Sequence, residues 1–281
     1  MEFPGIKEFK LNNFNREVEI FFLKFMQRCP SLTSFWVDGM ETAEFISSFS
    51  ELVAGKTWPH LHRITVKSCK LTCDTLSKII RSMQQITALD VHCYEPDFYS
   101  SNFMELVELL RPHFSNIRVL HLRAYDEMIS PMAQEILASC PLLEQLTAPP
   151  IDASVIAEGK PWVCTRLQEL DLMIVYKDSS LPRLQPLVFD QVARLVRLEK
   201  LWMDLHYWMI PDQVVELTFE NGLNKLSTLR SLRFMRLGDT NQEMGQQEID
   251  WILKYWTNME EFNGRKLSEN IDGKNMPWHP T

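Results

Sequence analysis

The sequence predicts an α/β solenoid of about ten strand–helix repeats, in which a parallel β-sheet lines the concave side of a horseshoe arc and helices cover the convex side. Three observations support this fold class. An apolar triplet with the spacing L-x-x-L-x-L occurs ten times, successive triplets begin 24 to 31 residues apart, and the stretches between them carry apolar residues at helical spacing. Because a single strand–helix unit cannot bury its apolar face alone, neighbouring units have to stack into a continuous core.

The triplets mark the expected strands, since their last two apolar residues alternate at the period of a strand that is buried on one face. Their mean spacing of about 28 residues lies within or just beyond the range of leucine-rich repeats. In order, the triplets are Ile6, Phe9 and Leu11; Leu32, Phe35 and Val37; Leu61, Ile64 and Val66; Ile86, Leu89 and Val91; Ile117, Leu120 and Leu122; Leu143, Leu146 and Ala148; Leu167, Leu170 and Leu172; Leu198, Leu201 and Met203; Leu229, Leu232 and Phe234; and Met259, Phe262 and Gly264.

Helices are expected between the triplets, and several of them begin at a residue whose side-chain oxygen can cap the first turn. These capping residues are Thr42, Asp74, Asn102, Ser130 and Asp212. The segment 178–186 contains two prolines and is predicted to be a loop. The helices are expected over residues 17–27, 42–53, 74–82, 102–110, 130–139, 189–195, 212–224 and 243–255.

Composition predicts one folded leucine-rich-repeat domain over residues 1–281, in which 265–281 forms a C-terminal capping tail. The chain is 45% hydrophobic and 23% charged, as in ordinary globular proteins, and contains no apolar run or leader that would indicate a membrane or secreted protein. We therefore expect it in the cytoplasm or nucleus. A net charge of −8 disfavours nucleic acid as a partner.

No motif for catalysis or for a cofactor is present, so the sequence predicts a protein that is not an enzyme and needs no cofactor. His60, His62, Cys69 and Cys73 are of the types that bind zinc, but they lack a matching second pair. Periodic packing explains the cysteines better, and all six are expected to be free thiols. A cryptic hydrolase, with a triad assembled from distant residues, remains an alternative.

Partner-binding residues are expected on the concave face, where the side chains that flank the buried strand positions point outward. Large aromatic residues and arginines dominate the hot spots of protein interfaces. The face is expected to be basic over the strands from Arg63 to Arg123 and acidic over those from Glu169 to Asp204. The candidate contact residues are Trp36, Arg63, Lys67, His92, His121, Arg123, Glu169, Asp171, Trp202 and Asp204.

Four segments have a recognisable repeat signature. They are Cys140-Pro141-Leu142-Leu143-Glu144-Gln145-Leu146, Pro161-Trp162-Val163-Cys164-Thr165-Arg166-Leu167, the segment from Cys69 to Asp74, and the leucines between Gly222 and Trp251. These segments resemble the ribonuclease-inhibitor-like leucine-rich repeats of fungal F-box proteins. The resemblance implies repeats that hold a substrate protein, while a separate N-terminal F-box docks to the ubiquitin-ligase core. Because the first triplet begins at Ile6, we expect no F-box in this chain.

The sequence thus predicts a protein–protein interaction scaffold, related to the substrate-recognition component of a ubiquitin ligase, with a protein substrate or adaptor on the concave face. An alternative is a repeat protein that binds an anionic ligand or nucleic acid at the basic concave patch. The strand around Phe9 and Leu11 lies at the N-terminal edge, and self-association through this edge is a further expectation.

Overall fold

The computed structural model describes residues 2–12, 16–39, 43–67, 71–92, 103–123, 130–176, 181–203, 215–237, 244–263 and 265–266. The chain divides into two compact units, Met1–Met128 (unit one) and Ile129–Thr281 (unit two). The prediction of a single domain remains a prediction. The expected capping tail lies outside the described residues, apart from its first strand residues.

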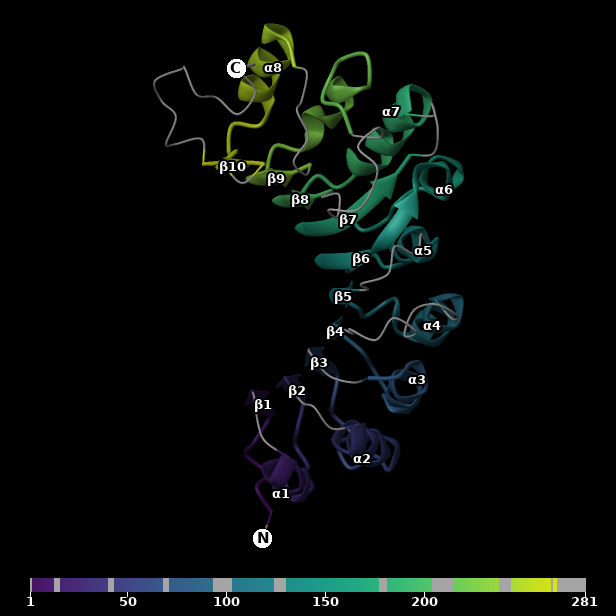
Figure 1. Ribbon diagram of the computed structural model, residues 1–281, viewed down its shortest axis with the longest axis vertical. Helices are drawn as coiled ribbons and strands as arrows, with labels where there is room; N and C mark the ends of the chain where they lie inside the picture. Colours follow the sequence, from purple (N-terminus) through teal and green to yellow (C-terminus); the bar gives the residue numbers. More distant parts are fainter. Residues whose placement is uncertain are drawn as a thin grey trace. The chain divides into compact units, whose positions relative to one another are not determined.

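Unit one alternates strands with helices. Its described strands are β1 (Glu8–Asn12), β2 (Ser34–Asp38), β3 (Arg63–Lys67), β4 (Ala88–His92) and β5 (Val119–Arg123), and they pair in this order, each parallel to the next. The described helices are α1 (Arg16–Met26), α2 (Ala43–Ala54), α3 (Cys73–Ser82), α4 (Phe103–Leu110) and the short 3₁₀ helix η2 (Arg111–His113). The α-helices follow one side of the strands (Figure 1).

Unit two repeats this alternation and ends in a short hairpin. The described strands are β6 (Gln145–Asp152), β7 (Glu169–Val175), β8 (Lys200–Trp202), β9 (Phe234–Arg236), β10 (Glu261–Phe262) and β11 (Arg265–Lys266). Strands β6 to β10 are parallel in sequence order, and β11 pairs antiparallel with β10. The described helices are α5 (Met132–Ser139), α6 (Ala153–Glu158), α7 (Leu181–Val192), α8 (Gln246–Tyr255) and the 3₁₀ helix η4 (Leu223–Thr228).

The strand–helix units form where the apolar triplets predict them. In β5 the side chains of Leu120 and Leu122 are fully buried, while the residues between and beside them are at least partly exposed. The backbone N–H of Arg118, just before β5, donates to the carbonyl of Thr87, and that of Thr87 donates to His62. This ladder aligns successive repeats, and the predicted class, an α/β leucine-rich-repeat solenoid with about ten repeats, is confirmed.

The register of one triplet was wrong. Met235 pairs with Leu201, so the ninth triplet is Leu232, Met235 and Leu237, all of which are buried. Phe234, which the sequence assigned to the core, is only half-buried and occupies an outward position of β9. The error arose because Leu229 and Leu232 themselves have the spacing of a triplet.

Two predictions in unit two were wrong for a common reason. The expected loop at 178–186 is helical from Leu181 onward, and the described part of the expected helix at 212–224 is irregular up to η4. Buried Gln185 of α7 donates from its amide nitrogen to the carbonyl of Glu216 at 2.6 Å and accepts from the N–H of Glu216 at 3.0 Å. These bonds attach the irregular segment around Glu216 to α7, where sequence periodicity alone predicts a helix.

Gly222 allows this segment to approach α7. Its φ angle of 93° lies in the left-handed region, and a Cβ atom there would be 3.1 Å from Cα of Pro186. Glycine is the residue that adopts this conformation without steric cost. Pro186 lies inside α7, and because Gly222 has no side chain, the next repeat can pack directly against this proline.

Helix starts agree with the sequence only in part. At α3 the cap is Thr72, whose hydroxyl accepts from the N–H of Thr75, and not the expected Asp74. At α5 the N-cap is Pro131 and not the expected Ser130, although the hydroxyl of Ser130 accepts from the N–H of Met132 at 3.2 Å. The other three expected caps, Thr42, Asn102 and Asp212, lie outside the described residues.

Buried tryptophans connect neighbouring repeats. The indole of Trp162 donates to the side-chain oxygen of Gln134 at 2.8 Å, and that of Trp58 donates to the carbonyl of Met26 at 3.0 Å. Trp256 donates in the same way to the carbonyl of Leu226 at 3.3 Å. Each indole thus fills the core of one repeat while satisfying a polar group of the previous repeat.

The cysteines at the repeat turns are buried free thiols. Cys29, Cys140 and Cys164 each stand three residues before a triplet, and the first residue of that triplet donates its N–H to the cysteine carbonyl. Burial raises the pKa of Cys140 to about 12, with the charges of Cys164 and Glu135 adding to the effect, and burial also raises that of Cys164 to about 12. Neither thiol forms a nucleophilic thiolate at neutral pH.

We expect Ellman's reagent at pH 8 to leave Cys140 and Cys164 unmodified in the native protein and to detect six thiols per chain after unfolding without a reductant. The variant Cys140→Ser/Cys164→Ser should show the native reaction unchanged and two thiols fewer when unfolded. A native reaction that loses amplitude in this variant, or an unfolded count below six, would contradict the assignment.

None of the helices within the described residues has the length and the apolar composition of a membrane-spanning segment.

Candidate functional site

The candidate site is the strand face of each unit, which we define as the side of the strands opposite the helices. In unit one the strand register arranges the outward side chains of this face in three rows that run across the sheet. The rows are Glu8, Ser34, Arg63, Ala88 and Val119; Lys10, Trp36, Thr65, Asp90 and His121; and Asn12, Asp38, Lys67, His92 and Arg123. Backbone pairing therefore fixes the spacing of every candidate residue in this unit.

Asp90 lies at the centre of the charged part of this face. Its Oδ2 is 3.2 Å from Nζ of Lys67, and its Oδ1 is 3.3 Å from Nε2 of His92 and 3.7 Å from Nδ1 of His121. The Asp90 side chain is 13% exposed. The sequence analysis overlooked this aspartate, although it stands between the buried Leu89 and Val91 and the same alternation rule places it outward.

The surroundings of Asp90 favour its ionised form. Burial alone would raise the pKa of the carboxyl group, but the contacts with His121 and His92 and the positive charges of His121 and Lys67 outweigh burial and hold that pKa well below its usual value. The carboxylate thus remains charged at neutral pH and faces three basic side chains.

We expect Asp90→Asn to lower the free energy of unfolding at pH 7 by roughly 1 to 3 kcal/mol, because the basic neighbours lose a charged acceptor. The folded-state pKa of Asp90 is depressed, so its contribution is complete above the unfolded pKa of about 3.9 and is lost as the pH falls below that value. Urea unfolding at pH 7 and pH 3 measures the difference between variant and wild type, which should shrink at pH 3. Glu51→Gln, on the exposed side of α2, is the control, and an equal loss at both pH values would contradict the role of the charge.

The structure places the predicted candidates of unit one on the strand face. Lys67, His92 and Arg123 are neighbours in one row, His121 stands beside them in the middle row, and Arg63 lies in the remaining row. Trp36 occupies the middle row of β2 and is half-buried rather than fully exposed.

An aromatic residue flanked by two cations is the main feature of the strand face in unit two. Nζ of Lys200 lies 6.0 Å from the ring centre of half-buried Trp202, and Cζ of Arg236 lies 5.9 Å from it. Each cation also meets a carboxylate: Lys200 binds Glu169 at 2.7 Å, and Arg236 binds Glu261 at 3.0 Å. Two cations therefore lie close to the indole, and each of them also forms an ion pair.

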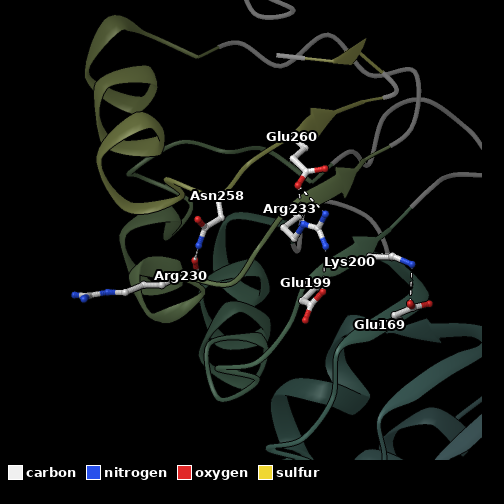
Figure 2. A network of polar contacts seen from close by, with 7 residues as sticks. All are labelled: Glu169, Glu199, Lys200, Arg230, Arg233, Asn258 and Glu260. Atoms are coloured by element: carbon white, nitrogen blue, oxygen red, sulfur yellow. Dashed lines mark hydrogen bonds and ion pairs between the residues drawn. The ribbon is translucent and has the colours of Figure 1, made fainter. Parts of the chain in front are cut away.

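A second network lies at the residues that immediately precede β8, β9 and β10 (Figure 2). Arg233 bridges Glu199 and Glu260, at 3.6 Å and 2.7 Å respectively. Hydrogen bonding and the charge of Glu260 raise the pKa of Arg233 further above its usual value. Asn258 reinforces the same edge by donating to the carbonyl of Arg230 at 2.9 Å.

The remaining candidates of unit two are placed in part. Glu169 and Asp171 lie on the strand face in β7, and Asp171 pairs with Trp202 across the strands. Asp204 lies outside the described residues. The sequence analysis missed Arg236, because the misplaced ninth triplet concealed its outward position.

The described residues contain no group of three or more His, Cys, Asp and Glu side chains arranged to hold a metal ion. His62 uses Nδ1 for a 2.8 Å contact with the carbonyl of His60, and Cys69 lies outside the described residues. The zinc interpretation of this segment gains no support from these positions.

Comparison with known proteins yields similarity in structure only. No protein-family model matches the sequence, and no curated protein matches it. A chain of the yeast Rad7 and Elc1 complex has a TM-score of 0.50 and 12% identity, over 92% of this chain and 69% of that chain. An internalin from Listeria monocytogenes gives 0.35 and 12%, over 85% of this chain and 49% of that one.

A leucine-rich-repeat protein of Leptospira interrogans gives a TM-score of 0.34 and 10% identity, over 93% of this chain and 76% of that chain. This chain thus spans about half the length of the internalin. At these identities the likeness to the yeast chain concerns the fold alone. Together with the strand pairing and the repeat spacing, it shows that the chain has the leucine-rich-repeat solenoid fold.

Proposed function

We propose that the chain is a non-enzymatic scaffold of the cytosol or nucleus that binds a protein partner through the strand faces of its two units. The arrangement of the strand-face side chains carries the proposal. Trp36, Arg63 and Arg123 in unit one and Trp202 in unit two emerge from paired strands at fixed register positions. Aromatic residues and arginines contribute most to protein interfaces, and a rigid sheet lowers the entropy lost when they are bound.

The charges of the two faces indicate what each recognises. On the strand face of β3 to β5, the side chains of Arg63, Lys67 and Arg123 outnumber the one carboxylate of these strands, that of Asp90, so we take this face to be basic. In unit two, Lys200 pairs with Glu169, and Asp171 stands next to Trp202 across the strands. We infer a partner that presents an acidic segment to unit one and an apolar or aromatic side chain to Trp202.

The test begins with capture of endogenous partners by the full chain, followed by binding kinetics with an identified partner. We expect Arg63→Glu/Arg123→Glu to reduce the association rate roughly 10-fold at low salt and to change the melting temperature little, because exposed charges steer the encounter. The matched control is Lys24→Glu/Lys78→Glu, which reverses two exposed charges on α1 and α3 of the same unit. A partner that binds both variants as fast as wild type would refute the basic face as its site.

Binding of an anionic ligand or nucleic acid is the second candidate function, and the basic row of Lys67, His92 and Arg123 is the observation that favours it. Asp90 at the centre of this cluster weakens it, because its carboxylate repels phosphate. A salt titration with a single-stranded oligonucleotide separates the two functions. Phosphate recognition weakens steeply as salt rises, whereas an interface centred on an aromatic residue does so much less.

For the biological setting, we propose that the scaffold selects the substrate of a ubiquitin ligase. The sequence resemblance to fungal F-box repeats supports this role, and the similar yeast chain comes from a complex with a second protein. Affinity capture with the full chain should then recover a cullin-complex component together with the substrate. Repeated recovery of protein partners without any such component would refute the ubiquitin-ligase role and leave the scaffold function standing.

We also propose that copies of the chain associate through β1, the end strand of unit one. Among the described residues β1 pairs with β2 alone, so its other edge offers unpaired backbone groups. Such an edge is a template for pairing with another strand. The concentration dependence of the mass in sedimentation equilibrium tests this association.

A further inference from the structure

At the outer edge of β1, every second residue directs its backbone N–H and C=O groups away from β2. The N–H groups of Thr33 and Ser34 both donate to the carbonyl of Lys7, which therefore faces β2. In a parallel strand the hydrogen-bonding groups alternate between the two sides. Lys7, Phe9 and Leu11 thus face β2, and Glu8, Lys10 and Asn12 direct their N–H and C=O groups away from it.

An aromatic cluster lies beside this edge. The ring of Phe9 lies 5.7 Å from that of Phe22 and 5.8 Å from that of Phe25, and Phe3 lies 5.1 Å from Phe25. All four phenylalanines are only half-buried, and Phe21 of α1 is 63% exposed. A group of partly exposed phenylalanines at the end of a repeat array is an apolar surface of the kind that associates in water.

The charges on β1 are complementary to those of a second β1 in one orientation. Glu8 and Lys10 are both exposed and lie on either side of Phe9. If two copies of β1 run antiparallel about Phe9, Glu8 of each copy stands opposite Lys10 of the other. Resting on the self-association proposed above, we propose that two copies of this chain form a two-fold dimer in which β1 pairs antiparallel with β1 of the second copy, with Phe9 opposite Phe9.

Backbone geometry and charge select the same register. Glu8 and Lys10 both direct their backbone groups to the open edge, so they form the hydrogen-bonded pairs of an antiparallel ladder, while Phe9 takes the closer, non-hydrogen-bonded position. Sliding one copy of β1 by two residues along the other places Lys10 opposite Lys10 in one direction and Glu8 opposite Glu8 in the other. Like charges directly opposite each other are destabilising. On the other side of the strand, the Phe9, Phe22 and Phe25 clusters of the two copies meet across the axis.

A two-fold contact of this type closes on itself, because the same patch serves both copies. The product is a dimer, in which each open β1 edge is covered by its counterpart. Another protein strand or a further segment of the chain on this edge would instead leave the protein monomeric at every concentration, and that outcome is part of the test.

The test is a charge swap in the full chain, read by sedimentation equilibrium at low salt. Glu8→Lys and Lys10→Glu should each weaken the dimer at least about 10-fold, because each places like charges opposite each other at two positions. The double variant Glu8→Lys/Lys10→Glu restores the complementary pairs and should dimerise like wild type. Glu51→Lys, an exposed change on α2, is the control, and far-UV circular dichroism spectra like that of wild type confirm that all variants fold.

The register has a second readout. A mixture of Glu8→Cys and Lys10→Cys chains should give a disulfide-linked heterodimer under mild oxidation, whereas neither variant alone should give a homodimer link at this position. A wild-type chain that stays monomeric at about 100 μM would overturn both the self-association and this register. A dimer that ignores the single swaps, or that the double swap fails to restore, would overturn the register and leave self-association standing.

Discussion

Replacing Leu120, Leu170 or Leu201 with alanine is expected to lower the free energy of unfolding by about 2 to 5 kcal/mol. Each leucine is the central apolar residue of its triplet and is at most 1% exposed, so truncation leaves a cavity between strand and helix. Leu170 and Leu201 are also neighbours across β7 and β8. Their losses should therefore not be additive in the double variant.

Urea unfolding followed by circular dichroism measures these losses. Leu253→Ala is the matched control, because this leucine lies on α8 and is 50% exposed. It should cost less than about 0.5 kcal/mol, as surface changes usually do. Wild-type stability in all three core variants would show that the strand register is wrong.

Trp162→Ala is expected to lower the free energy of unfolding by about 3 to 5 kcal/mol. The change removes a fully buried side chain from unit two and leaves the side-chain oxygen of Gln134 without its donor. The indole N–H is the donor to Gln134 Oε1. In addition, the backbone N–H of Trp162 donates to Gln191, and its carbonyl accepts from Arg194 at 3.0 Å. Both backbone bonds hold the segment that leads into β7.

The variant Trp162→Phe separates packing from hydrogen bonding. It keeps most of the apolar volume but leaves the buried oxygen of Gln134 without its indole donor, which costs roughly 1 to 3 kcal/mol. Adding Gln134→Leu should then cost less in the Trp162→Phe background than in wild type. Val163→Ala, at a neighbouring position that is 40% exposed, is the control, and additive losses would contradict the coupling.

The strands could be predicted from the repeat pattern alone, because the buried positions of each strand require apolar residues and these recur at a fixed spacing in the sequence. Phe35, Leu89 and Leu170 stand where the triplets place them. The ninth repeat was shifted because two consecutive spacings fit the same pattern, and only pairing with β8 separates Met235 from Phe234.

The glutamine contacts that direct the backbone of unit two could not be predicted. The sequence analysis placed Gln185 in a loop, yet this residue lies in α7 and its amide bonds to Glu216, 31 residues later. Such a contact depends on which repeat stacks on which helix, and spacing along the chain does not contain that information. The helix from Leu181 was missed for a related reason, since packing against Gly222 accommodates Pro186 inside it.

The candidate site was predictable as a face but not as a network. The alternation of side chains along a strand correctly predicted that Lys67, His92 and Arg123 point away from the core, because each of them follows a buried residue. Which of them would share a carboxylate depends on the pairing of β3, β4 and β5. The role of Asp90 therefore became visible only from distances between strands.

The glutamines of unit two also determine how this unit can come apart. Gln134 binds the carbonyl of Lys160 at 2.7 Å, Gln191 accepts from the backbone of Trp162, and Gln185 holds Glu216. Each of these bonds crosses from one repeat to its neighbour, so it is a coupling between adjacent units rather than part of the stability of either unit. In a linear array, strong coupling of this kind raises the free energy of a boundary between folded and unfolded repeats. Unit two should therefore melt as one block, and a protease or an unfolding machine that frees one repeat would release its neighbours with it.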